Sequence, residues 1–276
     1  MDWVYVFYIT GLGLAVGSFL NVVVLRYHTG RTVLGRSSCA SCAHKLSWFD
    51  LVPLASFVLL RGKCRYCRAR ISFQYPLVEL LTAFLFFLAA RQFLAGTLTY
   101  ASLLHFVTLL LALPFLVAIV VYDIRHKIIP DALAYGFAFV GIMFRTADVA
   151  QSGFTTAVLL DLAAGPLLFL PFFLLWFFSK GRWMGLGDGK LALGIGWLLG
   201  LSGGVLAVLF GFWSGALVGL FLVALTHLSV RRKGVTKVSL KSEVPFAPFL
   251  ILGVIDVLFF GLTSLFISML SQLHVF

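Results

Sequence analysis

Charged residues are scarce in this chain, at 11% of its 276 residues, whereas a soluble domain is about a quarter charged. Hydrophobic residues reach 61%, and the mean hydropathy is +1.06. The scarcity of charge excludes an ordinary soluble enzyme, and the apolar content excludes a disordered chain. The remaining class is an all-α polytopic membrane protein.

Acidic residues are the rarer charge, with 10 Asp and Glu against 21 Lys and Arg and a formal net charge of +11. In a soluble protein this excess would suggest nucleic acid, so the positions of the charges decide its meaning. The apolar runs predict about eight transmembrane helices, because each approaches the roughly 20 residues that cross a bilayer. They are residues 3–25, 77–95, 102–122, 132–149, 154–179, 190–201, 204–226 and 246–272.

Two stretches of the chain do not fit a simple apolar span of about 20 residues. The helix at 132–149 contains Arg145, which we expect to snorkel toward the interface. Residues 191–226 would form a single helix of about 54 Å, which is too long for one span. We therefore expect a break at Ser202–Gly204 and two crossings.

The basic residues test the number of spans. With eight spans, every Lys and Arg except Arg91 and Arg145 falls on one side, which the positive-inside rule makes cytoplasmic. Seven spans would divide the basic loops between the two sides. Both termini are then outside, and the basic excess is topological, with some attraction to anionic lipids. Asp2 stands where a signal peptide has basic residues, so we expect the first span to be retained. No nucleic-acid partner is expected. The basic loops are 26–75, 123–131, 180–190 and 227–245.

The sequence divides into a first transmembrane helix at 1–25, a cytoplasmic domain at 26–75 and a seven-helix membrane domain at 76–276. All four cysteines lie in the cytoplasmic domain, as two CxxC pairs with 21 residues between them. This spacing is close to that of a four-thiolate zinc knuckle, and four ligands would make the zinc structural rather than catalytic. Disulfides and a redox pair are the alternatives. The cysteines are Cys39, Cys42, Cys64 and Cys67.

Two aspartates are candidates for chemistry. Asp123 ends the third predicted helix and Asp188 precedes the sixth, both on the cytoplasmic side. Carboxylates close to the membrane are costly, which makes them functional candidates. Two neighbouring carboxylates tend to share one proton, so one activates water while the other polarises a peptide carbonyl. The glycines around Asp188 permit either a close substrate backbone or tight helix packing.

Other interpretations remain open for the acidic residues. Asp123 and Asp188 can instead pair with Arg125 and Lys190, or relay protons in a transporter. Asp131 follows Pro130 and is interpreted as a helix N-cap. Asn21 is expected to form an interhelical hydrogen bond, and Glu79 to pair with a loop arginine, whereas Asp161 and Asp256 are left open.

An ordered set of motifs resembles the type IV prepilin peptidases, also called leader peptidase/N-methyltransferases. The likeness extends over nearly the whole chain on an eight-span scaffold. The motifs are Gly17–Asn21 (GSFLN), the paired CxxC, Leu60–Arg65, Tyr75–Glu79 (YPLVE), Asp123 with Pro130-Asp131, Gly185–Asp188 (GLGD) with Lys190-Leu191, and Val244–Leu250.

The resemblance implies an aspartic protease of the bacterial inner membrane, with Asp123 and Asp188 catalytic and a zinc ion on the four cysteines. It also implies that prepilins or pseudopilins are the substrates, cut at the cytoplasmic edge of their hydrophobic helix. The new N-terminus is then methylated with S-adenosylmethionine. The resemblance also implies supporting residues in or beside the same motifs. Tyr122 precedes Asp123, which is similar to the Tyr-Asp pair of presenilin-type proteases. The supporting residues are Tyr122, Asp131, Gly185, Gly187 and Lys190.

The sequence departs from the family pattern at two positions. Ala247 stands where the closing motif has Gly, and Asp50 stands where an Asn often precedes Pro53. No soluble-type methyltransferase fingerprint is present, since no strand precedes Gly185–Gly189, so methylation rests on the resemblance. The alternatives are a peptidase without methyltransferase activity, and a proton-coupled transporter or assembly factor.

Overall fold

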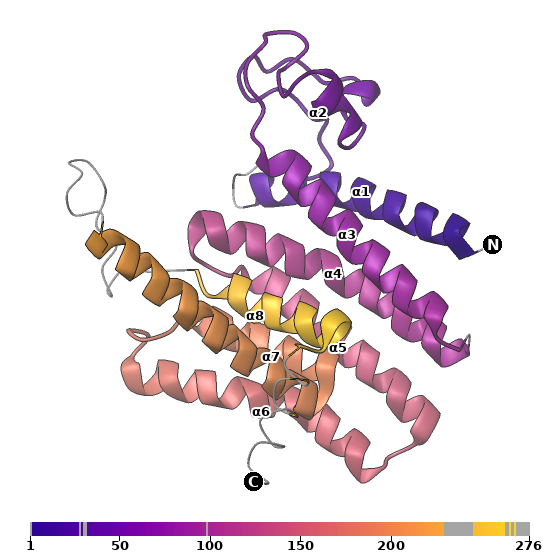
Figure 1. Ribbon diagram of the computed structural model, residues 1–276, viewed down its shortest axis with the longest axis vertical. Helices are drawn as coiled ribbons and strands as arrows, with labels where there is room; N and C mark the ends of the chain where they lie inside the picture. The colour runs from indigo at the N-terminus through magenta and orange to yellow at the C-terminus, as the bar shows by residue number, and fades with distance from the viewer. Residues whose placement is uncertain are drawn as a thin grey trace. The chain divides into compact units, whose positions relative to one another are not determined.

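The computed structural model describes residues 2–27, 29, 32–97, 99–228 and 245–262, together with Leu265 and Ser268. All regular elements in these residues are helical, which confirms the all-α prediction (Figure 1). The elements are α1 (Asp2–Arg26), η1 (Trp48–Asp50), α2 (Ala55–Leu59), α3 (Gln74–Ala95), α4 (Tyr100–His126), α5 (Asp131–Ser152), α6 (Thr156–Ser179), α7 (Leu186–Leu228), α8 (Ala247–Ile255) and η3 (Asp256–Phe260).

Five of the helices are long and apolar enough to cross a membrane, as far as the described residues reach. They confirm a polytopic membrane protein, whereas the count of eight spans stays a prediction. Part of the predicted helix at 246–272 and most of the basic loop at 227–245 lie outside the described residues. The five are Trp3–Arg26, Gln74–Ala95, Tyr100–His126, Thr156–Ser179 and Leu186–Ala224.

The chain forms two compact units, Met1–Val121 and Tyr122–Phe276. In the first unit α1 packs on α3. A Cβ atom on Gly17 would lie 2.7 Å from the Cα of Glu79, so only glycine allows this close approach. The Asn21 amide donates to the carbonyl oxygen of Tyr75 at 3.2 Å, which confirms its predicted interhelical hydrogen bond.

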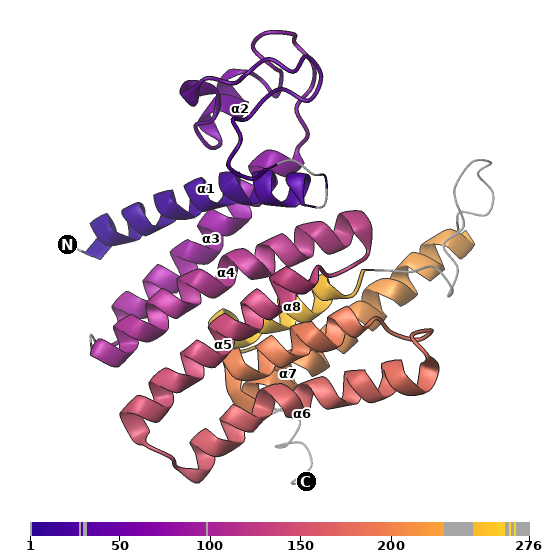
Figure 2. The same ribbon diagram turned by 180° about the vertical axis from the view of Figure 1, so that it is seen from behind.

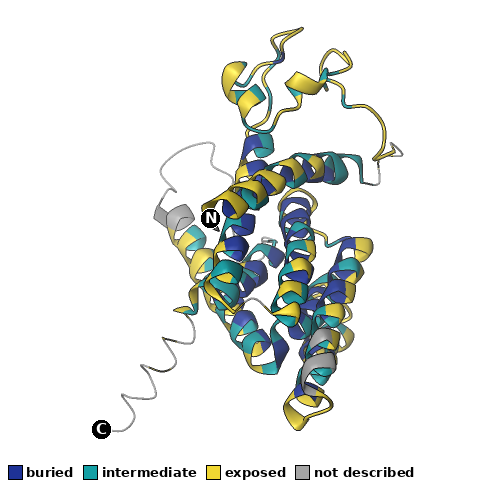
Figure 3. Ribbon diagram, turned by 90° about the vertical axis from the view of Figure 1, so that its right-hand side faces the viewer, coloured by how far each residue is buried: buried dark blue, intermediate teal, exposed yellow. Residues whose placement is uncertain are grey.

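The segment between α1 and α3 is largely exposed (Figure 3) and contains η1, α2 and two isolated β-bridges. Glu79, 6% exposed, accepts a hydrogen bond from the backbone N–H of Leu54 at 2.8 Å. This bond joins the segment to α3. Among the described residues no arginine pairs with Glu79, and Arg31 of the same loop lies outside them, so the pairing with a loop arginine stays a prediction. A backbone donor that the fold brings to the carboxylate cannot be recognised in the sequence.

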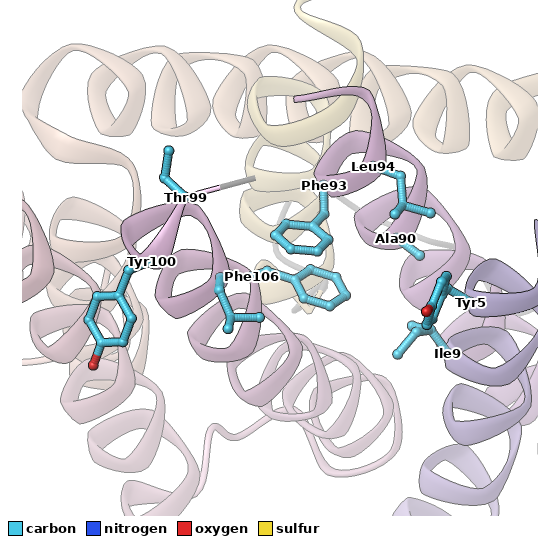
Figure 4. A pocket seen from close by; sticks show the side chains of 9 residues that line it. Tyr5, Ile9, Ala90, Phe93, Leu94, Thr99, Tyr100 and Phe106 are labelled. Atoms are coloured by element: carbon cyan, nitrogen blue, oxygen red, sulfur yellow. The ribbon is translucent and has the colours of Figure 1, made fainter. Parts of the chain in front are cut away.

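A mainly apolar cavity of about 470 Å³ also lies in the first unit (Figure 4). Tyr5 and Ile9 of α1 line it, together with Phe93 of α3 and Phe106 of α4. The last two rings stack at 4.3 Å between centroids. No acidic or basic side chain lines the cavity, so it lacks the groups that hydrolysis requires.

In the second unit α7 packs on α5, α6 and α8. It contains one break, at Gly200 with φ 75° and ψ −176°, rather than at the predicted Ser202–Gly204. The helix breaks at Gly200 because the break requires a positive φ, which glycine adopts without the steric cost of a side chain. A break in 191–226 is thus confirmed, while its position was wrong.

Arg145 and Asp161 satisfy the backbone groups that the break frees. The Arg145 guanidinium donates to the carbonyl oxygens of Trp197 at 2.7 Å and Leu198 at 2.8 Å. The Asp161 carboxylate accepts from the N–H of Leu201 at 2.9 Å. Arg145 therefore caps a helix end with its guanidinium, whereas snorkelling toward the membrane interface stays a prediction.

Asp256 has a similar role at the end of α8. Its side chain is 3% exposed, and its carboxylate accepts from the backbone N–H of Leu262 at 3.0 Å. The backbone turns there through Gly261, at φ 63°. The carboxylate thus binds the backbone N–H that follows the turn at Gly261, after η3.

Candidate active site and metal centre

Asp123 lies in the last turn of α4 and is 4% exposed. Its Oδ2 accepts a hydrogen bond from the backbone N–H of Ala247 at 3.1 Å. Ala247 is the first residue of α8, so the positive end of this helix faces the carboxylate. The resemblance gave the closing Pro-Phe-Ala-Pro motif no role, and the fold shows that it positions this N–H.

Asp188 lies in the first turn of α7 and is partly exposed. The carboxylates of Asp123 and Asp188 lie within electrostatic range of each other, although 65 positions separate them in the sequence. The structure thus brings the two candidate aspartates together within one unit. Among the described residues, neither forms an ion pair with Arg125 or Lys190.

The glycines around Asp188 differ in what surrounds them. A Cβ atom on Gly187 would lie 3.0 Å from the Cβ of Ile129, and one on Gly189 would lie 3.1 Å from the Cβ of Phe172. These two glycines permit tight packing of the start of α7. Gly185 is exposed, and a Cβ atom there would meet nothing closer than Asp188 Oδ2 at 3.8 Å. It leaves space beside the carboxylate.

The supporting residues also have definite contacts. Lys190 Nζ donates to Asp131 Oδ1 at 2.7 Å and lies 5.2 Å from the ring centre of Tyr135. Pro130 occupies the N-cap of α5 and Asp131 its first turn, so the N-cap interpretation of Asp131 is wrong. The lysine contact decides the position of its side chain instead. Tyr122 is 5% exposed, and its ring packs against that of His126, with 4.4 Å between the ring centroids.

The four cysteine Sγ atoms lie within 4.8 Å of one another. Those of Cys39 and Cys67 are 3.8 Å apart, which matches the edge of a tetrahedron around zinc with Zn–S bonds of about 2.3 Å. The backbone N–H groups of Cys42 and Ser41 lower the pKa of Cys39 to about 6, which favours the thiolate that binds metal. The donor set therefore fits zinc.

Each CxxC pair is held by the same backbone pattern. The N–H of Ala43 donates to the carbonyl oxygen of Cys39 at 2.9 Å, and the N–H of Arg68 donates to that of Cys64 at 3.0 Å. Ala43 and Arg68 both have a positive φ, at 58° and 61°. The two turns are therefore equivalent, as expected for two knuckles that share one ion.

Asp50 binds the second knuckle to the segment that precedes η1, which sequence reasoning missed. Its side chain, 3% exposed, accepts from Arg65 Nε at 2.7 Å, from the Tyr66 hydroxyl at 3.0 Å and from the Ser47 N–H at 3.2 Å. Burial acts to raise the pKa of Asp50, but these donors outweigh it and hold the pKa below its usual value. The ring of Tyr66 packs against that of His44, with the centroids 3.7 Å apart and the planes tilted by 33°.

Comparison with known proteins shows which family the chain belongs to. Residues 12–93 match the family model described as the bacterial peptidase A24 N-terminal domain, and residues 110–220 match the type IV leader peptidase family. The type 4 prepilin-like proteins leader peptide-processing enzyme of Escherichia coli is 32% identical over 268 residues, covering 87% of this chain and 88% of that protein. The chain belongs to the type IV leader peptidase family. All four cysteines lie within the first match, and both candidate aspartates lie within the second.

Other family members are similar over different lengths. The prepilin leader peptidase/N-methyltransferase of Myxococcus xanthus is 35% identical over 217 residues, which span 78% of this chain and 62% of the relative. The protein of the same name from Xanthomonas campestris is 30% identical, with 91% of this chain and 90% of that one covered. No solved structure matches the chain.

Proposed function

We propose that this member of the leader peptidase family is an aspartic endopeptidase, with Asp123 and Asp188 as its catalytic pair. It cleaves the leader peptides of prepilins or pseudopilins. The observation that supports the proposal is the electrostatic interaction between the carboxylates of Asp123, in the last turn of α4, and Asp188, in the first turn of α7. The names of the relatives support the substrate class.

The surroundings of the two carboxylates suggest how they divide the work. Two carboxylates that repel each other electrostatically tend to hold one proton between them, because like charges disfavour double ionisation. The Ala247 N–H and the positive end of α8 stabilise a negative charge on Asp123. We therefore assign the ionised role to Asp123 and the proton to Asp188.

Hydrolysis then follows by general acid–base catalysis. Asp123 removes a proton from a water molecule, whose oxygen attacks the carbonyl carbon of the scissile peptide. Asp188 donates its proton toward the carbonyl oxygen as the tetrahedral intermediate forms. Collapse of that intermediate breaks the C–N bond, as the proton held by Asp123 passes to the leaving amine and a hydroxyl proton of the intermediate returns to Asp188. The open space at Gly185 accommodates the substrate backbone next to Asp188.

The surrounding parts have matching roles in this proposal. Residues 1–25 form the first transmembrane helix, 26–75 a cytoplasmic zinc domain and 76–276 the membrane peptidase domain. The concentration of basic residues supports a cytoplasmic active site in a bacterial inner membrane. Bound to the four cysteines, zinc would staple a segment too small to build a large core. S-adenosylmethionine would supply the methyl group for the new N-terminus, a step supported by the relatives' names.

Mass spectrometry of a prepilin incubated with the purified protein and S-adenosylmethionine tests the proposal. We expect loss of the leader and gain of one methyl group, and no cleavage by Asp188→Asn. Asp148→Asn is the matched control, because Asp148 binds Arg145 and lies outside the proposed pair. Cleavage by Asp188→Asn at the normal rate would reject the catalytic pair.

The same experiment separates the alternatives. A cleaved product that stays unmethylated in the presence of S-adenosylmethionine would indicate a peptidase without methyltransferase activity. Intact prepilin, together with proton-coupled flux in reconstituted vesicles, would indicate a transporter instead.

A further inference from the structure

A groove of about 490 Å³ lies on the segment between α1 and α3, apart from the cysteine thiols. Phe57 of α2 and Phe73 form apolar walls, with their rings 5.5 Å apart. Three exposed cations, Arg61, Lys63 and Arg70, line the same groove. The groove therefore combines an apolar surface with a concentrated positive charge.

The cations lack a counter-charge in their own segment. An isolated antiparallel bridge places Lys63 directly opposite Arg70, and like charges in that position destabilise a pair of strands. Asp50 is the only acidic residue between Tyr27 and Phe73, and Arg65 and Tyr66 already occupy its carboxylate. An external anion in the groove would relieve this repulsion.

Large apolar side chains are exposed in the lining of the groove, at Val58 and Phe73, and next to it in the sequence, at Leu59. Val58 is 70% exposed, Leu59 81% and Phe73 79%. All three lie outside the candidate membrane spans, so lipid tails around a spanning helix do not explain their exposure. Apolar residues beside Lys and Arg are typical of elements that lie in the membrane interface.

Chain connectivity keeps the groove near a bilayer surface. The segment starts where α1 ends, at Arg26, and finishes where α3 begins, at Gln74, and both helices are candidate spans. Figures 1 and 2 show α2 on the side of the segment that lies back along α1, toward the N-terminus of that helix. This is the direction in which α1 enters the membrane.

We propose that this groove binds the anionic phospholipid headgroups of the adjacent leaflet. Arg61, Lys63 and Arg70 contact the phosphates, while Val58 and Leu59 insert at the boundary of headgroups and acyl chains. Each basic residue near an anionic surface strengthens binding about fivefold. Lipid binding would hold the proposed zinc domain against the membrane, beside the helices that carry it.

Hydrogen–deuterium exchange of the full-length, zinc-loaded protein in lipid nanodiscs tests the proposal. Phosphatidylcholine nanodiscs are compared with nanodiscs that also contain phosphatidylglycerol. We expect the amides of residues 55–63 to exchange severalfold more slowly with the anionic lipid. Arg61→Glu/Arg70→Glu removes this protection. The control Arg36→Glu/Lys45→Glu keeps it, because it changes the charge equally at exposed residues outside the groove.

Two results would overturn the assignment. One is equal exchange of residues 55–63 in the two lipid mixtures. The other is equal loss of protection in both charge-reversal variants, which would indicate an effect of net charge alone. Val58→Ser/Leu59→Ser tests the apolar contact, since protection as strong as in the wild type would reject insertion. Zinc content measured on every variant shows that the knuckles are intact, so a folding defect is recognised separately.

Discussion

The hydrogen bond between the Ala247 N–H and Asp123 predicts a difference between two substitutions of the same residue. Asp123→Asn keeps an oxygen that can accept this bond, whereas Asp123→Ala removes the acceptor. Ala247 is fully buried, so water cannot readily replace the lost partner. Both variants lose the carboxylate that the proposed reaction needs.

The magnitudes follow from the two roles of the carboxylate. Loss of a general base lowers the rate about 10²–10⁴-fold, and we expect this for both variants. A buried donor left without an acceptor costs about 1–3 kcal/mol, and only Asp123→Ala should show this loss of stability. Asp123→Asn exchanges a charge-assisted bond for a neutral one, which costs about 1 kcal/mol.

Two assays separate these effects. Leader cleavage followed by mass spectrometry gives the rate, and thermal unfolding in detergent gives the difference in stability between the variants. Normal cleavage by Asp123→Asn would refute the catalytic role. Equal unfolding temperatures for Asp123→Asn and Asp123→Ala would refute the structural role of the hydrogen bond.

Three further predictions concern the glycines, the acidic residue of the segment before α3, and the metal. Gly187→Ala should lower both cleavage and stability, since its Cβ would lie 3.0 Å from that of Ile129 and overpacking costs about 1–3 kcal/mol. Gly185→Ala is the control in the same unfolding assay and should leave stability nearly unchanged. Asp50 has a lowered pKa, so its stabilising effect is present above its unfolded pKa of about 3.9 and is lost as pH falls through the folded value. The protection factor of the segment's amides, which is the intrinsic exchange rate divided by the measured rate, should therefore fall in acid, and Asp50→Asn should reduce this dependence. Chelation of zinc should open the segment to proteolysis, and resistance equal to that of the zinc-loaded protein would reject a structural metal.

The class of the protein can be predicted from its sequence. Composition and apolar runs predict a helical membrane protein, because hydrocarbon requires long apolar segments with internally satisfied backbones. The CxxC spacing brings each cysteine pair together locally, and the fold confirms that the two pairs meet. The choice of Asp123 and Asp188 also came from the sequence, because acidic residues are rare at membrane edges. Their catalytic roles stay a prediction.

The partners of the polar residues, in contrast, depend on how distant parts of the chain pack together. Asp131 precedes an apolar run and suggests a cap, yet Lys190, from another helix, binds its carboxylate. Arg145 suggests snorkelling, yet the break at Gly200 frees carbonyl groups that bind its guanidinium. The bond between Ala247 and Asp123 joins residues 124 positions apart. A local pattern records what a residue can do, whereas its actual contact depends on which distant backbone groups the packing leaves unpaired.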